Sequence, residues 1–448
     1  MAEPRYFDPQ DAKPQERAVL VGTVFRNDDR DEEEENLQEL AQLSRAAGAR
    51  VLHALVQERN APSVSTYIGR GKVEELAALC KEREANLIIF DSELSPVQAR
   101  NLEKRTEINV CDRTELILDI FARRARTRQA RLQVELAQLE YLRPRLRRMW
   151  EHLSRQEGGI GTRGPGETQL EVDRRRLGDR VSQLKRELDK VARVSETKAR
   201  QRRGRGFGVA LVGYTNVGKS SLLNALTGAD AYVADALFAT LDSTTRRLDL
   251  DGSEPVLITD TVGFVRKLPH HLVESFKATL AEVSEADLVL HVVDLASASW
   301  ERQVLAVEEV LGDLDVDPER CLRVFNKLDA ARDADEVLAG LGTRWPDACF
   351  VSATTGAGLE ALRAAIRARR QEAFRETVLF LPAGGEALTA TIYAECEVRD
   401  VRYESEGSYY RLRLAEATRA RLLARGAEEC PELLDGWDAD LPNGNGAP

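Results

Sequence analysis

The chain has 448 residues, of which 43% are hydrophobic, and its formal net charge at pH 7 is -11. A chain of this length is expected to form about three domains with substantial cores. No apolar run approaches the roughly 20 residues of a membrane-spanning helix, and the N-terminus lacks the basic and apolar regions of a signal peptide. We therefore expect a cytoplasmic protein without membrane insertion. The six cysteines form no C-x-x-C pair and the five histidines no cluster, so neither disulfides nor zinc are expected.

Residues 1–120 alternate short apolar runs with helical patterns. The expected strands are residues 18–21, 51–56, 87–90 and 108–111, with helices between them. This alternation predicts a small parallel α/β domain. Its Gly69-Arg70-Gly71-Lys72 could contact a second nucleotide or RNA at a helix N-terminus, but the spacing falls short of a phosphate loop and favours a structural turn. The charged run 28–35 is expected to be a solvated loop and helix start.

Residues 121–205 are expected to form a basic helical hairpin. From Phe121 to Gly206 there are 24 Lys or Arg residues against 11 Asp or Glu, a local charge of +13 that leaves -24 for the remainder. Apolar side chains recur there at coiled-coil-like spacings on both sides of a glycine-rich turn. They are Leu132, Leu136, Leu139, Leu146 and Leu153 before the turn, and Leu177, Val181, Leu184, Leu188 and Val191 after it.

The turn of this hairpin combines glycine with arginine. Gly159, Gly161, Gly164 and Gly166 lie near a group of arginines, namely Arg143, Arg145, Arg147, Arg148, Arg163, Arg174, Arg175 and Arg176. A plain solvated helix pair would explain the charge equally well. A glycine-rich basic loop also lets the backbone approach RNA closely, and a basic stretch in an acidic chain can neutralise phosphates. The glycines tilt our interpretation towards a structured RNA partner.

A phosphate-binding loop is predicted in the next part of the chain, residues 206–372. The octet Gly213-Tyr214-Thr215-Asn216-Val217-Gly218-Lys219-Ser220 follows an apolar run and precedes a helix-like segment. Backbone N–H groups of such a loop, together with the helix N-terminus, cradle a polyphosphate. Lys219 would reach the β- and γ-phosphates, and Ser220 would hold Mg²⁺.

Three further short motifs follow in order, each after an apolar run. Asp260-Thr261-Val262-Gly263 is a candidate γ-phosphate sensor, in which Asp260 approaches Mg²⁺ through water and the Gly263 amide touches the phosphate. Asn326-Lys327-Leu328-Asp329 resembles the guanine-specifying element of translation-factor-like GTPases, where Asp329 accepts from guanine N1–H and the exocyclic amine. Adenine presents the wrong donors to such a site. Ser352-Ala353-Thr354 would back the base. Together these motifs predict a doubly wound P-loop GTPase domain that binds GTP with Mg²⁺.

Residue 264 departs from the Ras-like pattern, in which a glutamine orients the attacking water. Here the position is Phe264, and packing under the switch is the favoured interpretation of it. Hydrolysis by the free protein should be slow, because water must be positioned by another group, by backbone or by a partner. His270-His271 could help, although an exposed pair is the favoured alternative.

The first switch is expected within residues 237–246. Several threonines there compete for Mg²⁺, and a hydroxyl from this loop normally completes the metal shell when GTP is bound. Thr240 is our choice, because Phe238-Ala239-Thr240-Leu241 resembles the Obg-HflX branch of GTPases. Thr244 and Thr245 are the alternatives, and they are expected to begin a strand towards Leu248.

Nearly the whole chain resembles an HflX-type GTPase. The resemblance is carried by Phe238-Ala239-Thr240-Leu241-Asp242, Asp260-Thr261-Val262-Gly263-Phe264, Tyr67-Ile68-Gly69-Arg70-Gly71-Lys72 and the segment Gly158-Gly159-Ile160-Gly161-Thr162-Arg163-Gly164-Pro165-Gly166-Glu167-Thr168-Gln169-Leu170. It implies binding to the large ribosomal subunit, GTP hydrolysis stimulated by that subunit, and a role in splitting or rescuing stalled ribosomes. We expect a monomer in which Lys219, Thr240 and Gly263 serve catalysis.

Two other functions stay open from the sequence alone. One is a signalling GTPase that acts on protein effectors, and the other is an RNA-remodelling ATPase run from the N-terminal domain. Residues 373–430 are expected to form a small α/β domain, with a helix near Ala387 and strands carrying Tyr393, Val398, Tyr403, Tyr409 and Tyr410. Residues 431–448 mix Pro, Gly, Asn and Asp and are expected to be disordered.

Overall fold

The computed structural model describes residues 15–26, 30–156, 175–191, 207–228, 237–238, 241–250, 256–267, 280–331, 334–384 and 386–437. The chain forms two compact units. The first contains residues 1–191 together with 234–242 and 262–279, and the second contains residues 192–233, 243–261 and 280–448. Within the described ranges, no helix is long and apolar enough to cross a membrane.

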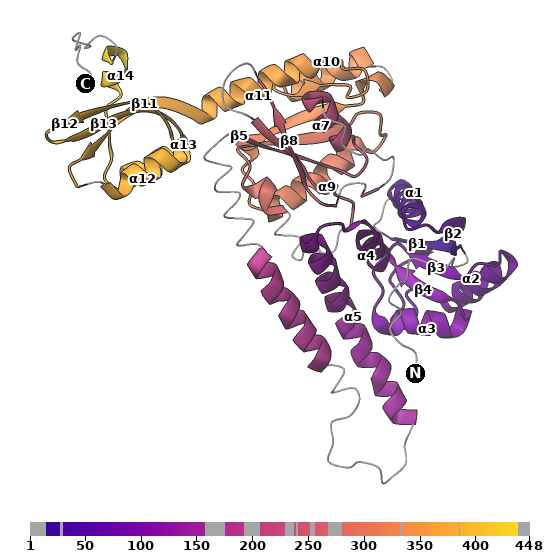
Figure 1. The fold of residues 1–448 in the computed structure, drawn as a ribbon. Coiled ribbons are helices and arrows are strands. Elements are labelled where there is room, and N and C mark those ends of the chain that lie inside the picture. The colour runs from indigo at the N-terminus through magenta and orange to yellow at the C-terminus, as the bar shows by residue number, and fades with distance from the viewer. Residues whose placement is uncertain are drawn as a thin grey trace, which may run out of the picture. The chain divides into compact units, whose positions relative to one another are not determined.

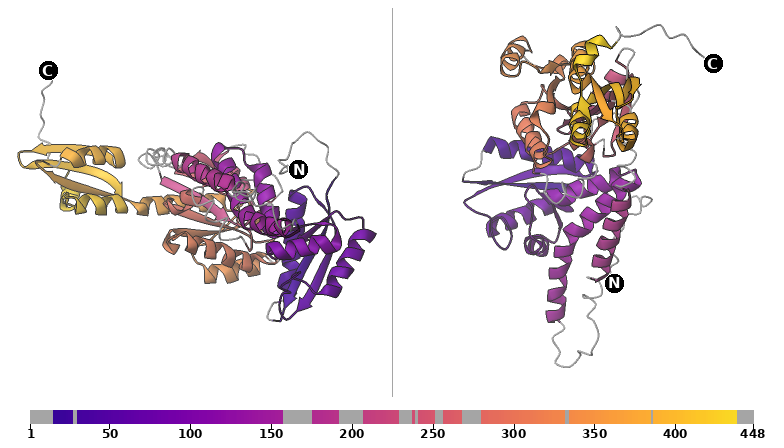
Figure 2. Two further views of the ribbon diagram at one scale, coloured as in Figure 1. Left: turned by 90° about the horizontal axis from the view of Figure 1, so that it is seen from below. Right: turned by 90° about the vertical axis from the view of Figure 1, so that its left-hand side faces the viewer.

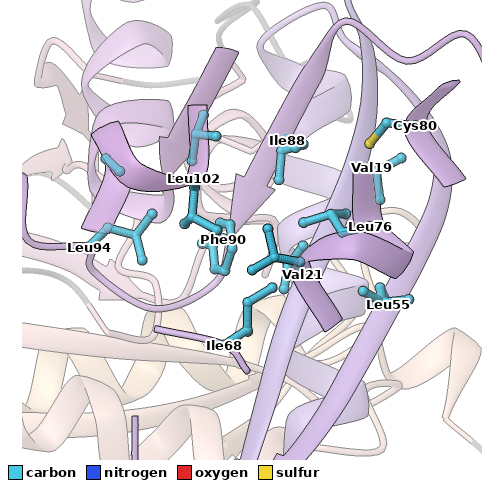
Figure 3. Close-up of a cluster of buried hydrophobic side chains, with 13 residues drawn as sticks. Val19, Val21, Leu55, Ile68, Leu76, Cys80, Ile88, Phe90, Leu94 and Leu102 are labelled. Carbon is cyan, nitrogen blue, oxygen red and sulfur yellow. The ribbon is translucent and has the colours of Figure 1, made fainter. Parts of the chain in front are cut away.

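The N-terminal part of the first unit is a parallel α/β domain, as predicted. Its strands are β1 (Arg17–Phe25), β2 (Arg50–Arg59), β3 (Leu87–Phe90) and β4 (Asn109–Asp112), ordered β2-β1-β3-β4 and all parallel. The helices are α1 (Arg30–Ala46), α2 (Arg70–Glu82), α3 (Pro96–Thr106) and α4 (Arg113–Arg124). Val21, Ile68, Leu76, Ile88 and Phe90 are buried together in one core of this domain (Figure 3).

The start of α1 departs from the expected solvated run. The Glu33 carboxylate is buried, and its Oε1 accepts from the backbone N–H of Thr23 in β1 at 3.1 Å. A buried carboxylate requires hydrogen-bonding or charged partners, and those partners come from far along the chain.

The predicted hairpin helices are α5 (Arg128–Gln156) and residues 175–191, which lie side by side (Figures 1 and 2). Their seam contains seven of the predicted apolar residues, Leu132, Leu136, Leu139, Val181, Leu184, Leu188 and Val191. Ion pairs flank it, with Arg180 2.7 Å from Glu135 and Lys185 2.8 Å from Glu140. The turn 158–166 and the side chains of Leu146 and Leu153 lie outside the described residues.

The second unit contains a six-stranded sheet ordered β10-β9-β8-β5-β7-β6. The strands are β5 (Phe207–Gly213), β6 (Thr244–Leu248), β7 (Val256–Asp260), β8 (Leu288–Asp294), β9 (Cys321–Asn326) and β10 (Cys349–Phe350). Only β6 runs antiparallel to its neighbour among the pairs of this sheet, and it begins at Thr244 as predicted. The accompanying helices include α7 (Lys219–Thr227), α9 (Trp300–Asp313), α10 (Ala334–Arg344) and α11 (Leu359–Ala373). This is the expected doubly wound arrangement.

An antiparallel sheet ordered β12-β13-β11-β14 follows α11. Its elements are β11 (Phe374–Pro382), α12 (Glu386–Glu395), β12 (Glu397–Glu404), β13 (Gly407–Ala415), α13 (Glu416–Ala424), β14 (Glu428–Glu429) and α14 (Glu432–Gly436). Tyr393 lies in α12, so its predicted strand is wrong. The neighbouring Ile392 turns into the core instead, because a helix places residues of one face at spacings of three and four.

The C-terminal tail begins later than expected. Residues 432–436 are helical, and Trp437 is buried beside β12. Its indole N–H donates to Asp400 Oδ2 at 2.8 Å, and the guanidinium of Arg402 lies 4.2 Å from its ring centroid. The predicted boundary at Pro431 is therefore too early, because one aromatic side chain holds this segment on the sheet. Residues 438–448 lie outside the described part of the chain.

Candidate nucleotide-binding site

Two glycines shape the loop between β5 and α7. Gly213 has φ of 153°, and a Cβ there would lie 2.3 Å from the carbonyl oxygen of Val292. Gly218 has φ of 91°, and a Cβ there would lie 2.4 Å from Asn326 Nδ2. Both positions exclude a side chain, because the loop passes directly against β8 and the end of β9. The backbone conformation of the predicted phosphate loop thus depends on the absence of a side chain at both glycines.

Lys219 lies beneath this loop. Its Nζ donates to the carbonyl oxygens of Gly213 at 3.1 Å and Tyr214 at 2.8 Å, and the residue is buried. Burial lowers the pKa of Lys219 to about 8, against the opposing effect of the Asp260 carboxylate. The ammonium is therefore a poorly solvated positive charge, which a bound polyphosphate would neutralise.

This shifted pKa predicts a pH dependence of nucleotide affinity. Bound phosphate favours the charged form of Lys219 and raises its pKa in the complex. The affinity for GTP is therefore highest at pH values below the Lys219 pKa of the nucleotide-free protein, and it falls as the pH rises through about 8. By proton linkage the loss approaches tenfold per pH unit between about pH 8.5 and 9.5. Titration with a non-hydrolysable GTP analogue measures it. A flat affinity between about pH 7 and 9.5 contradicts the assignment, and Lys219→Ala is expected to remove this slope.

Oxygen donors suited to Mg²⁺ meet at the start of α7. Ser220 Oγ donates to Asp260 Oδ2 at 2.6 Å, and Asp260 is buried at the end of β7. Next to it, the Thr261 hydroxyl donates to the carbonyl oxygen of Leu211 at 2.7 Å, which fixes this end of β7 against β5. A hydroxyl and a carboxylate are hard oxygen ligands of the kind that Mg²⁺ uses alongside substrate phosphates. The donor set fits the ion.

A buried hydroxyl in the loop also fits a polar ligand. Among the described residues, Thr215 Oγ1 is a buried atom without a hydrogen-bond partner. Such groups are uncommon in folded proteins, because an unpaired polar atom costs about 1–3 kcal/mol. Asn216, next to it, has φ of 62°, in the region that favours asparagine among non-glycine residues.

Asn326 connects the phosphate loop with the loop after β10. Its Nδ2 donates to the carbonyl oxygen of Val217 at 2.8 Å, and its Oδ1 accepts from the backbone N–H of Ala353 at 3.1 Å. The side chain is buried. Two of the predicted motifs are therefore joined through one amide, and neither loop can move without disturbing its hydrogen bonds.

The predicted base-binding residues lie together at the ends of β9 and β10. Ser352 Oγ donates to Asp329 Oδ1 at 2.5 Å, and the Asp329 residue is otherwise exposed. Lys327 has φ of 62°, and its Nζ lies 2.7 Å from Asp294 Oδ2. The backbone N–H of Leu328 donates to Val351 at 3.2 Å. An exposed carboxylate on a fixed backbone can accept two donors from the edge of a purine base.

Comparison with known proteins assigns the chain to a family. Residues 34–122 match the family described as GTP-binding GTPase N-terminal, residues 124–203 its middle region, and residues 208–327 the family described as 50S ribosome-binding GTPase. A protein called GTPase HflX from Caldanaerobacter subterraneus subsp. tengcongensis is 46% identical over 82% of each chain. This chain belongs to the HflX family of GTPases.

Other relatives agree in extent. A GTPase HflX from Escherichia coli K12 is 44% identical over 90% of this chain and 93% of its own. A crystal structure of a GTP-binding protein from the archaeon Sulfolobus solfataricus in complex with GDP is 23% identical, with a TM-score of 0.42, over 80% of this chain and 99% of that one. As the curated relatives and the family matches show, this member of the HflX family is a GTP-binding protein and a GTPase.

In this HflX-family GTPase, the segment 237–246 that we expect to hold the first switch is divided: residues up to Asp242 belong to the first unit, and residues from Ser243 onwards belong to the second. Phe238 is buried with φ of 55°, and its ring meets that of Phe121 edge to face at 4.7 Å. Asp242 accepts from the backbone N–H of Arg126 at 2.9 Å and of Thr127 at 3.2 Å, just before α5. Leu241 is buried as well. The Phe238 side chain thus contacts α4 and the Asp242 side chain contacts the residues just before α5, whereas Ala239 and Thr240 lie outside the described residues.

The end of the predicted γ-phosphate sensor and the residues after it also belong to the first unit. Val262, Phe264 and Val265 are buried, and Phe264 is only 2% exposed. This agrees with the packing interpretation of Phe264, and it removes the ring from any role in orienting water. Gly263 lies between buried neighbours. His270-His271 falls outside the described residues.

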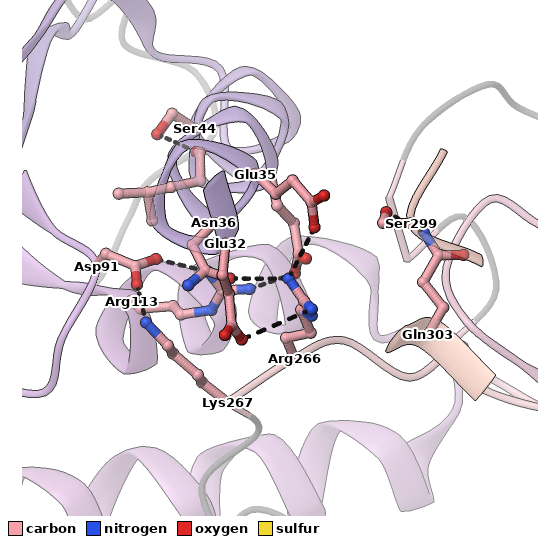
Figure 4. A network of polar contacts seen from close by, with 12 residues as sticks. Glu32, Glu35, Asn36, Ser44, Asp91, Arg113, Arg266, Lys267, Ser299 and Gln303 are labelled. Atoms are coloured by element: carbon pink, nitrogen blue, oxygen red, sulfur yellow. Dashed lines mark hydrogen bonds and ion pairs between the residues drawn. The ribbon is translucent and has the colours of Figure 1, made fainter. Parts of the chain in front are cut away.

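Sequence reasoning missed a charged network in the same unit (Figure 4). Arg113 is fully buried, with Nη1 2.7 Å from Asp91 Oδ1 and a second ion pair to Glu39. Lys267 and Arg266 contact α1 and the end of β3. The signals available were the acidic run 28–35 and the Arg-Lys pair just after the sensor, but nothing in the sequence connects the two.

Gly69-Arg70-Gly71-Lys72 forms the start of α2. The Gly69 N–H donates to Gln57 Oε1 at 2.8 Å, Arg70 pairs with Glu74 at 3.3 Å, and Lys72 pairs with Glu75 at 2.8 Å. Both cations are engaged by carboxylates of their own helix. The contacts favour the structural turn over a second nucleotide site.

Proposed function

We propose that this GTPase binds the large ribosomal subunit with its basic hairpin against ribosomal RNA, and that GTP controls the splitting or rescue of stalled ribosomes. The observation that supports it most is the hairpin region itself: residues 121–206 carry a net charge of +13, and the two helices within this region have their own apolar seam. The seam holds the helices together by apolar packing, and Arg180 and Lys185 pair with carboxylates of the facing helix. Exposed arginines such as Arg143 and Arg176 would supply the phosphate contacts. We further propose that the protein acts as a monomer in the cytoplasm.

The proposed chemistry rests on charge stabilisation. Lys219 and the N–H groups of residues 213–220 would bind the β- and γ-phosphates, and Asp329 would select guanine. Mg²⁺ would be held by Ser220 and Thr240 and would neutralise charge on the phosphate oxygens. Gly263 would report the γ-phosphate through its backbone amide. Because Phe264 is buried, we propose that turnover is slow until the ribosome orders the groups that position water.

Each alternative function makes a distinct prediction. A signalling GTPase acting on protein effectors would turn over GTP at the same rate with or without ribosomal particles. An RNA-remodelling ATPase of the N-terminal domain would show RNA-stimulated ATP hydrolysis that survives Lys219→Ala. The contacts of Arg70 and Lys72 with their own helix make this second alternative the weaker one.

Steady-state GTP hydrolysis with purified particles tests the proposal. Large subunits are expected to raise the rate by at least about a hundredfold, in the range of other GTPase activators, whereas small subunits and naked RNA leave it near the basal value. The exposed Arg143 and Arg176 supply the matched variant. Replacing both with Gln should weaken subunit binding and reduce its salt dependence, with Arg344→Gln in the second unit as control. Equal turnover under every condition would refute ribosome dependence.

A further inference from the structure

The segment after Gly263 is anchored by two consecutive cations. Lys267 Nζ lies 2.5 Å from Asp91 Oδ2 and 3.5 Å from Glu33 Oε2, and these carboxylate side chains are 0% and 7% exposed. Arg266 Nη1 donates to Glu35 Oε2 at 3.3 Å and to Asn36 Oδ1 at 3.2 Å. Figure 4 shows both side chains directed from their loop towards α1 and Asp91.

Asp91 and Glu33, the two carboxylates that hold Lys267, lie where the strand order of the N-terminal sheet reverses. In the order β2-β1-β3-β4, the chain passes from β2 across β1 to β3, so the order reverses between β1 and β3. Open parallel sheets bind ligands outside the carboxyl ends of their strands at such a reversal. Asp91 directly follows β3, and Glu33 accepts from Thr23 near the end of β1. Lys267 of the same chain therefore takes a position that this sheet type commonly gives to a ligand.

The two buried carboxylates, Asp91 and Glu33, favour a cation at this position. Burial opposes ionisation of Asp91, but Arg113 and Lys267 together hold the pKa of its carboxyl below the usual range. Burial raises the pKa of Glu33, an effect that Lys267 counters. Arg113 is already shared with Glu39. Lys267 is thus the cation that faces both Asp91 and Glu33, and within the part of the chain that the structure describes its removal would take away the ion pair of Glu33.

The anchor limits how far Gly263 can move. Asp260 is held by Ser220 on one side of the glycine, and Lys267, only four residues after it, is held on the other. Phe264 and Val265 between them are buried, and Lys267 itself has φ of 51°. A backbone amide fixed in advance binds its target without a further ordering cost.

We propose that Lys267 is a positioning residue for the γ-phosphate sensor: by docking on Asp91 and Glu33 it holds Gly263 ready, and the preference for GTP over GDP depends on it. This inference rests on the proposed role of Gly263. GDP lacks the γ-phosphate, so the docking contributes to the affinity for GTP and leaves the affinity for GDP unchanged. The N-terminal domain thereby influences nucleotide discrimination through the docking of Lys267.

Binding of GDP and of a non-hydrolysable GTP analogue to the full chain tests the proposal. Lys267→Met keeps the apolar stem and removes the charge. This variant is expected to bind the GTP analogue about tenfold more weakly, a typical size for coupling through a packed network. Its affinity for GDP should stay within about twofold of the unsubstituted protein. Lys267→Arg should restore most of the preference. Lys190→Met, an exposed lysine of the hairpin, is the matched control and should change neither ligand.

Three outcomes overturn the proposal. If the affinities for GDP and for the analogue fall equally, Lys267 has only a structural role. If neither affinity changes, Lys267 has no role in nucleotide binding. If the analogue binds more tightly, the contact of Lys267 with Asp91 and Glu33 opposes GTP binding. If Lys267→Met lowers the thermal unfolding temperature strongly, the double variant Lys267→Met with Glu33→Gln removes the uncompensated carboxylate and is measured in its place. Normal GDP binding in every variant shows that the nucleotide site is intact, which separates this test from failure of the site assignment itself.

Discussion

Replacement of Lys219 with Ala is expected to abolish tight GTP binding. The ammonium is buried under the phosphate loop and makes two hydrogen bonds to it, so a bound polyphosphate would lose a desolvated charge partner. Truncation of one partner of such a pair costs roughly 2–5 kcal/mol, or about 30- to 5000-fold in affinity. Equilibrium binding of a fluorescent GTP analogue measures the loss.

Lys72→Ala is the matched control for this variant. It removes a lysine at the start of α2, whose ammonium pairs with Glu75, and GTP affinity should stay within about twofold, as for other surface changes. Unchanged affinity in Lys219→Ala would refute the site assignment. A loss of GTP affinity in Lys72→Ala would instead indicate that the N-terminal domain takes part in GTP binding.

Asp329→Asn is expected to reverse the base preference of the site. The exposed Asp329 carboxylate can accept from the two donors of guanine, whereas an asparagine amide offers a donor where guanine also has one. Loss of a paired base contact reduces affinity by about a hundredfold or more. Xanthosine triphosphate carries an oxygen in place of the exocyclic amine, so it should bind the variant better than GTP does. Competition between the two triphosphates measures this switch.

A control for Asp329→Asn is available in the same unit. Asp315 is exposed with φ of 54°, a conformation that asparagine tolerates, and Asp315→Asn should keep the preference for GTP. A variant at residue 329 that loses GTP and xanthosine triphosphate alike would point to damage of the Ser352 contact and would contradict the proposed guanine recognition.

The sheets and the seam of the hairpin could be predicted because their signals are local. Strands β1, β3 and β9 are short apolar runs, and the Leu132 to Val191 pattern repeats at helical spacings. The phosphate loop has a fixed spacing because each glycine meets a specific obstacle, Val292 or Asn326. Local patterns of this kind can be interpreted without knowledge of the rest of the chain.

Long-range electrostatics could not be predicted. Glu33 belongs to a run that resembles a solvated helix start, yet Lys267 lies 3.5 Å from it although the two are more than 200 positions apart. Arg113 gave no signal either, because a buried arginine looks like any other until its carboxylates are known. Trp437 was missed for the same reason, since it follows a short helix and its partners Asp400 and Arg402 lie more than 30 residues earlier, on β12.

Because Asp242 contacts the residues just before α5, a small rotation at this contact would move the far end of the hairpin helix by a much larger distance. Asp242 holds the backbone N–H groups of Arg126 and Thr127, and α5 extends for 29 residues beyond them. At 1.5 Å per residue this helix is about 44 Å long. A tilt of about 5° at its root would carry the far end through about 4 Å, the width of a base or a side chain. A small change at the segment that we propose as the first switch would thus be enlarged along this helix.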